Sequence, residues 1–134
     1  MIIALLMAQN VDKIIEYWIK KTKKFVDGFI ILNDASTDNT LTILNRLKDE
    51  YNILEIISTD MPQFNEFESD TPANAMDSKY NNNVKVNCKL LEAGRKHGGT
   101  MFVKLDADEM LSSTFKDIDG IKNFPSDVLY AFFA

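Results

Sequence analysis

The sequence predicts an α/β domain with a mainly parallel sheet and flanking helices. Short apolar runs alternate with segments of helical periodicity, which gives the order β-α-β-α-β-α-β. Strands that alternate with helices in this way pair in parallel, and right-handed crossovers place the helices on the faces of the sheet. The apolar runs are continuous rather than alternating, as is typical of strands that are buried on both faces.

The first part of the chain predicts two strands and two helices. Residues 2–7 and 29–32 are continuous apolar runs and are interpreted as strands. Between them, helical spacing predicts a helix whose buried face consists of Val11, Ile14, Ile15, Trp18, Ile19 and Thr22. The spacing of Leu41, Leu44 and Leu47 predicts a second helix, with Asp38 or Thr37 as its N-cap.

The second part predicts a third and a fourth strand over residues 53–57 and 101–105. Residues 59 to about 80 have no usable periodicity and are interpreted as a long loop, which is either functional or disordered. A helix is expected from Asn82 to His97, closed by Gly98-Gly99, with Cys88 as a small core residue. A short helix near 110–115 and a fifth strand over 128–133 complete the prediction.

The composition is that of one compact acidic domain over residues 1–134, with 46% hydrophobic residues. The net charge of −5 is a poor match for a phosphate backbone, so we do not expect nucleic-acid binding. An acidic protein that binds phosphates needs a metal ion or backbone donors instead. The N-terminal apolar run is too short to span a membrane and lacks the basic start of a signal peptide. We therefore expect a cytoplasmic protein without a transmembrane segment.

Polar residues follow three of the predicted strands. Gln9-Asn10 follows the first, Asn33-Asp34 the second, and Asp106-Ala107-Asp108 the fourth. The carboxyl ends of parallel strands meet at one edge of the sheet, and α/β sheets bind ligands beyond that edge. Helix capping alone also accounts for polar residues at such positions. Their occurrence after three strands favours a shared site.

The fourth strand ends in three nearby carboxylates, those of Asp106, Asp108 and Glu109. Crowded anions raise one another's pKa values unless a positive charge compensates them. Residues i and i+2 share a face of a strand about 6.6 Å apart, so Asp106 and Asp108 can point into one crevice. A divalent cation that prefers oxygen ligands is the natural occupant. The alternative is a polar loop in which Asp108 caps the next helix.

Two motifs resemble those of a known enzyme family. Residues 31–40, ILNDASTDNT, resemble the first signature of the family 2 glycosyltransferases, an acidic pair followed by a small residue and Ser-Thr-Asp. With residues 105–109, LDADE, they resemble the paired signature of that family's GT-A fold, a Rossmann-like nucleotide-diphospho-sugar transferase fold. The resemblance covers nearly the whole chain, and each motif follows a predicted buried strand.

The resemblance implies a role for each matching residue. Asp34 matches the position that contacts the nucleotide base, and Gln9 and Asn10 match the loop that lines the nucleotide pocket. Asp106 and Asp108 match the Asp-x-Asp motif, in which one acid is directed towards the ribose and the other binds Mn²⁺ or Mg²⁺ on the diphosphate. The implied partners are a nucleotide-sugar donor, for which we expect a UDP-sugar, and an unidentified saccharide, lipid or protein acceptor.

Several positions have other interpretations or depart from the family pattern. For Ser36, Thr37 and Asp38 we favour helix capping over substrate contact, and Asn33 stands where the family often has an acid. The sequence ends at Ala134 inside the predicted fifth strand, which suggests an N-terminal portion of a longer domain. The general base of the family lies beyond this point, so the catalytic residue is unassigned and Glu109 is only the nearest candidate.

The predicted function is therefore metal-dependent transfer of a sugar from a nucleotide-sugar donor. Two alternatives remain open from the residues. A truncated or degenerate domain of this fold would bind a ligand or partner without turnover. A phosphatase of the haloacid-dehalogenase type would use Asp106 as its nucleophile, but those proteins carry the motif on their first strand rather than the fourth.

Overall fold

The computed structural model describes residues 1–60 and 72–109 and confirms the alternating order of strands and helices. The elements are β1 (Ile2–Ala8), α1 (Ile15–Thr22), β2 (Gly28–Asn33), α2 (Thr40–Leu47), β3 (Ile53–Ser58), α3 (Pro72–Lys96) and β4 (Met101–Lys104). The predicted helix near 110–115 and strand over 128–133 lie outside the described residues.

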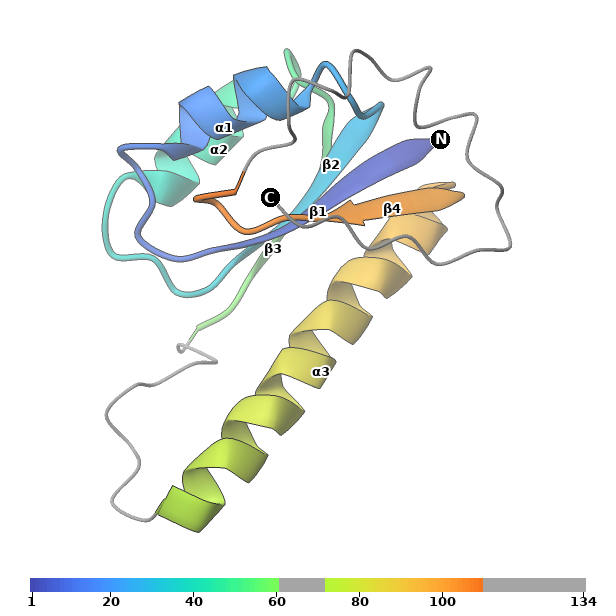
Figure 1. Ribbon diagram of the computed structural model, residues 1–134. Helices are drawn as coiled ribbons and strands as arrows, with labels where there is room; N and C mark the ends of the chain where they lie inside the picture. The colour runs from blue at the N-terminus through green and yellow to red at the C-terminus, as the bar shows by residue number, and fades with distance from the viewer. Residues whose placement is uncertain (61–71, 110–134) are drawn as a thin grey trace.

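The four described strands form one parallel sheet, as the sequence predicts, and their order in it is β3-β2-β1-β4 (Figure 1). β1 pairs with β2 along its length and with β4 from Ile2 to Leu5. Ala8 lies opposite Asn33, whereas Lys104 lies opposite Leu5. β4 therefore ends earlier than β1, and the chain after it leaves the sheet beside the last residues of β1.

Helices cover both faces of the sheet, with α1 and α2 on one face and α3 on the other (Figure 1). Alternate residues of β1 reach the two sides, because successive side chains of a strand point in opposite directions. Leu6 packs in the cluster that contains Trp18 and Leu44, and Leu5 packs in the cluster that contains Leu90. The two apolar clusters explain why the strands appear as continuous apolar runs.

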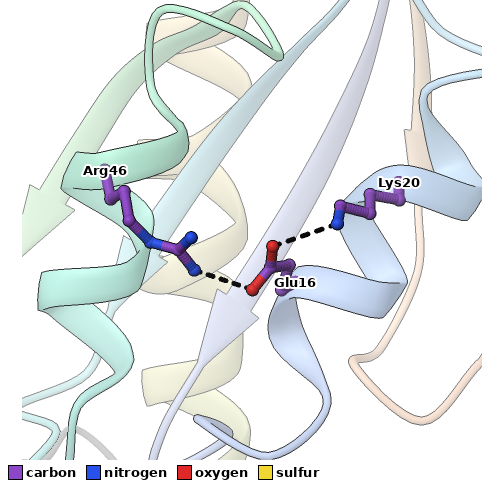
Figure 2. Close-up of polar contacts among 3 residues, drawn as sticks. All are labelled: Glu16, Lys20 and Arg46. Carbon is purple, nitrogen blue, oxygen red and sulfur yellow. Dashed lines mark hydrogen bonds and ion pairs between the residues drawn. The ribbon is translucent and has the colours of Figure 1, made fainter.

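The carboxylate of Glu16 on α1 forms ion pairs with Lys20 on the same helix and with Arg46 on α2 (Figure 2). Glu16 lies 3.1 Å from the ammonium of Lys20 and accepts a hydrogen bond of 2.7 Å from Arg46. The hydrogen bonds from Arg46 and Lys20 lower the pKa of Glu16, and the hydrogen bond to Glu16 raises that of Lys20. These groups are exposed to solvent, so the contribution to stability is small.

The long segment before β4 differs from the prediction. α3 begins at Pro72, so residues 72–80 are helical rather than part of a loop. Figure 1 shows the Pro72 end reaching beyond the sheet while the Lys96 end lies beside β4. Residues 72–80 have no usable apolar periodicity, so the sequence does not predict this part of the helix.

Three smaller expectations were wrong. Asn39, rather than Asp38 or Thr37, is the N-cap residue of α2. Cys88 is exposed, because α3 buries the face that carries Val86 and Leu90, and a residue two positions from Val86 points elsewhere. Ile14 is 40% exposed because α1 begins only at Ile15.

The core on the α1 and α2 side predicts a stability difference between two α2 variants. Leu44 is fully buried, so Leu44→Ala should lower the free energy of unfolding by about 2–5 kcal/mol. The exposed Thr42 lies on the same helix, and Thr42→Ala should change it by less than about 0.5 kcal/mol. Urea denaturation measures both values. Equal values for the two variants would contradict this packing.

Candidate functional site

The polar segments that follow β1, β2 and β4 lie at one edge of the sheet, because all the strands run in the same direction. The direction in which the chain moves across the sheet reverses between β1 and β4. The helix that follows β1, α1, lies on one face of the sheet, and the helix that precedes β4, α3, lies on the other. Ligands of open α/β sheets bind at such a reversal of strand order. The expectation that these segments share an edge is confirmed.

The loops after β1 and β2 are joined by Asn10. Its side-chain oxygen accepts hydrogen bonds from the main-chain N–H groups of Thr37, at 2.8 Å, and Asp38, at 3.3 Å. Its own N–H donates to the Ser36 hydroxyl at 3.1 Å. Asn10 has a φ of 50°, a conformation that asparagine adopts more readily than most residues. Asn10 is exposed and Gln9 half-buried, and Asn10 holds two loops of the candidate site together.

Asp38 extends this connection to the start of α2. Its carboxylate accepts hydrogen bonds from the main chain of Thr40 at 2.9 Å and of Asp12 at 3.1 Å. Partial burial acts to raise the pKa of Asp38, but the hydrogen bonds from Thr40 and Asp12 outweigh it and hold the pKa below 3.8. Asp38 therefore accepts from the first N–H of α2, although Asn39 rather than Asp38 is the N-cap residue.

Asp34 lies directly after β2 and is fully buried. Its carboxylate accepts a hydrogen bond of 3.0 Å from the hydroxyl of Thr59, and its N–H donates to the carbonyl of Ala8 at 2.8 Å. The Thr59 N–H donates to the carbonyl of Asn33 at 3.1 Å, so the ends of three strands are joined here. Thr59 has no motif in the sequence and was missed for that reason.

Residues 106–109 form a turn that closes on itself. The Glu109 N–H donates to the carbonyl of Asp106 at 2.9 Å, and the Glu109 carboxylate accepts from the Asp106 N–H at 3.0 Å. Leu105 and Ala107 pack against the core, whereas the side chains of Asp106 and Asp108 are exposed. The two carboxylates of the predicted Asp-x-Asp motif therefore both face solvent.

The donor set of this turn suits a magnesium or manganese ion that a diphosphate helps to bind. Exposed carboxylates are oxygen ligands, and Mg²⁺ is typically held by one or two of them together with substrate phosphates. Over residues 1–60 and 72–109, no three Asp, Glu, His or Cys side chains are placed to hold a metal by themselves. Lys104 lies 3.5 Å from the Asp106 carboxylate, so a cation at Asp106 would compete with that ammonium.

The candidate residues occupy two sides of β1. Asp34 lies at the end of β2, and Asp106 and Asp108 follow β4, so β1 separates them in the sheet. Two strand spacings amount to about 10 Å, which leaves room for an extended ligand across the end of β1. Gln9 and Asn10 lie between, at the end of β1 itself.

Solved structures provide the comparison that decides the fold. The structure of S. aureus TarS matches with a TM-score of 0.51 and 16% identity over 80% of this chain. TarS 1-349 with UDP-GlcNAc matches with a TM-score of 0.56 and 16% identity over 91% of this chain. TarS is a family 2 glycosyltransferase. This chain has a GT-A-like fold.

The GT-A-like fold was predicted from the two motifs and is confirmed. The chain spans 16% of the length of TarS and 29% of TarS 1-349 in its UDP-GlcNAc complex. No model of a known protein family matches the chain, and no curated protein sequence matches it significantly. Within the part of the chain that the structure describes, no helix is long and apolar enough to cross a membrane.

The hydrogen bonds and the positive φ of Asn10 predict that Asn10→Ala is less stable than Asn10→Gly. Asn10→Gly loses the hydrogen-bond acceptor and should lower the free energy of unfolding by about 1 kcal/mol. Asn10→Ala loses the same acceptor and also places a Cβ at a positive φ, which costs roughly 1 kcal/mol more. Urea denaturation of both variants tests this order. Alanine as stable as glycine at this position would contradict it.

The lowered pKa of Asp38 predicts how stability depends on pH. A carboxyl whose pKa is lower in the folded state stabilises the protein above its unfolded pKa and loses this effect as the pH falls through the folded pKa. Wild type should therefore exceed Asp38→Asn in unfolding free energy at neutral pH. The difference should shrink as the pH falls below 3.8. Denaturation at a series of pH values measures it, and a difference that grows in acid would refute the assignment.

Proposed function

We propose that this chain is the nucleotide-sugar-binding part of a glycosyltransferase. The observation that carries the proposal is the position of Asp34, Asp106 and Asp108 at the carboxyl edge of a GT-A-like sheet, on both sides of its central strand. Solved structures with this fold are complexes of TarS with UDP and with UDP-GlcNAc. We therefore propose a uridine nucleotide sugar as the donor.

Asp34 is proposed to recognise the base. Its carboxylate is a buried acceptor, and a buried acceptor discriminates strongly against a ligand that lacks the matching N–H donor. The Thr59 hydroxyl, which donates to Asp34 at 3.0 Å, is the contact that a ring N–H would replace or extend. Asn10 is proposed to act indirectly, by fixing the loops after β1 and β2 around the nucleotide.

Asp106 and Asp108 are proposed to hold Mn²⁺ or Mg²⁺ against the diphosphate. Such an ion would neutralise the charge that develops on the leaving nucleoside diphosphate. The exposure of both carboxylates leaves them accessible to ligands from solvent, and Leu105 and Ala107 anchor the turn to the core. The net charge of −5 does not oppose nucleotide binding when a cation lies between the acidic protein and the phosphates.

In the proposed reaction, an acceptor hydroxyl oxygen bonds to the anomeric carbon while the bond from that carbon to the diphosphate oxygen breaks. The bonding electrons leave with the nucleoside diphosphate, and a general base takes the hydroxyl proton. Glu109 is a poor choice for this base, because its carboxylate already accepts the hydrogen bond of the Asp106 N–H. The base stays unassigned, and binding without turnover is the alternative for this chain.

Isothermal titration of the purified chain with UDP, with and without Mn²⁺, tests the proposal. Wild type should bind UDP more tightly when Mn²⁺ is present. Asp106→Asn should lose most of this gain, about tenfold or more in affinity, because it removes a charged ligand. Asp34→Asn should weaken binding with and without the metal.

Asp49→Asn provides the matched control, because Asp49 is exposed and follows α2 at the opposite edge of the sheet. It should bind UDP as wild type does under both conditions. Absence of UDP binding even with Mn²⁺, or full metal-dependent binding by Asp106→Asn, would overturn the proposal.

A further inference from the structure

A core tryptophan makes a direct contact with the acidic turn after β4. The indole N–H of Trp18, in the middle of α1, donates a hydrogen bond of 2.9 Å to the main-chain carbonyl of Glu109. The two residues are 91 positions apart in the sequence. We propose that Trp18 and Glu109 are positioning residues that hold Asp106 and Asp108 in the arrangement that binds the metal-diphosphate group, an inference that rests on the function proposed above.

The side chain of Trp18 is held in the core and can therefore anchor the turn of residues 106–109. This side chain is fully buried, and its ring lies 5.8 Å from that of Phe29 on β2. A buried indole N–H needs a hydrogen-bond acceptor, and it finds one here in a turn whose acidic side chains are exposed. The core therefore dictates where the carbonyl of Glu109 lies.

The acidic turn is held at both ends. At its start, the Leu105 N–H donates to the carbonyl of Leu5 on β1 at 3.4 Å. At its end, Glu109 is bound to Trp18. Asp106 and Asp108 lie between these two anchors, and the Glu109 carboxylate holds the Asp106 N–H from within the turn. The backbone that carries the two exposed carboxylates is thus held at both ends.

Loss of the hydrogen bond from Trp18 should affect the position of Asp106 and Asp108 more than the stability of the domain. The hydrogen bond between the indole and the Glu109 carbonyl is part-buried and Glu109 itself is exposed, so in Trp18→Phe we expect water to take the place of the indole N–H. The turn then loses its anchor. The main loss falls on the geometry of Asp106 and Asp108, which matters only when a cation and a diphosphate are bound together.

Trp18→Phe and Phe29→Leu form a matched pair for the test, because both residues are fully buried aromatics of the same cluster and, of the two, Trp18 alone donates a hydrogen bond to the turn. Isothermal titration with UDP gives the affinity with and without Mn²⁺. Trp18→Phe should reduce the gain from Mn²⁺ by about fivefold and leave the metal-free affinity unchanged. Phe29→Leu should lower the midpoint temperature of thermal unfolding and keep the increase in UDP affinity that Mn²⁺ produces.

Glu109 provides a second test that does not disturb the core. Glu109→Ala removes the acceptor of the Asp106 N–H and should reduce the gain from Mn²⁺, whereas Glu109→Gln retains an amide oxygen in its place and should keep most of it. Equal losses in the two variants would show that Glu109 acts through its charge and would overturn its positioning role.

The outcomes distinguish this inference from the function on which it rests. A wild-type chain whose UDP affinity does not respond to Mn²⁺ defeats the proposed function and the inference with it. Two outcomes would overturn the inference alone. In one, Trp18→Phe keeps the full increase in UDP affinity that Mn²⁺ produces in the wild-type chain. In the other, Phe29→Leu loses that increase as much as Trp18→Phe does.

Discussion

The arrangement of the whole domain depends on the burial of β1 between two strands and two layers of helices. Its residues alternate between the cluster of α1 and α2 and the cluster of α3, and its two edges pair with β2 and β4. A strand in this position cannot bend away from the sheet, so the loop that follows Ala8 begins at a fixed point. The candidate site is built around that point, with Asp34 on one side and Asp106 on the other.

The candidate site is held together by main-chain contacts more than by its acids. Asn10 and Asp38 join the loops after β1 and β2, and Thr59 joins the end of β3 to Asp34. Trp18 joins α1 to the turn after β4. Each contact uses a main-chain group or a small polar side chain, and the carboxylates of Asp106 and Asp108 stay exposed while their backbone is fixed. Pre-organised ligands of this kind lower the cost of binding.

Elements with a local signal were predictable from the sequence, and long-range contacts were not. The four described strands were predicted to within two residues, because each is an apolar run, and β1 and β2 are buried on both faces. The start of α3 at Pro72 was missed, since residues 72–80 have no usable apolar periodicity in the sequence. The motifs of Asp34 and Asp106 indicated the edge of the sheet at which the candidate site is placed. Trp18 appeared as an ordinary core residue, because no sequence pattern records a hydrogen bond to Glu109.

In the proposed function, one ligand spans the carboxyl edge of the sheet from β2 to β4. Backbone amide NMR shifts of the chain, recorded before and after addition of UDP and Mg²⁺, test this directly. Shifts are expected at Asp34, in the loop of Asn10 and in residues 106–109, on both sides of β1. No shifts, or shifts confined to the opposite edge near Gly28 and Thr100, would contradict it.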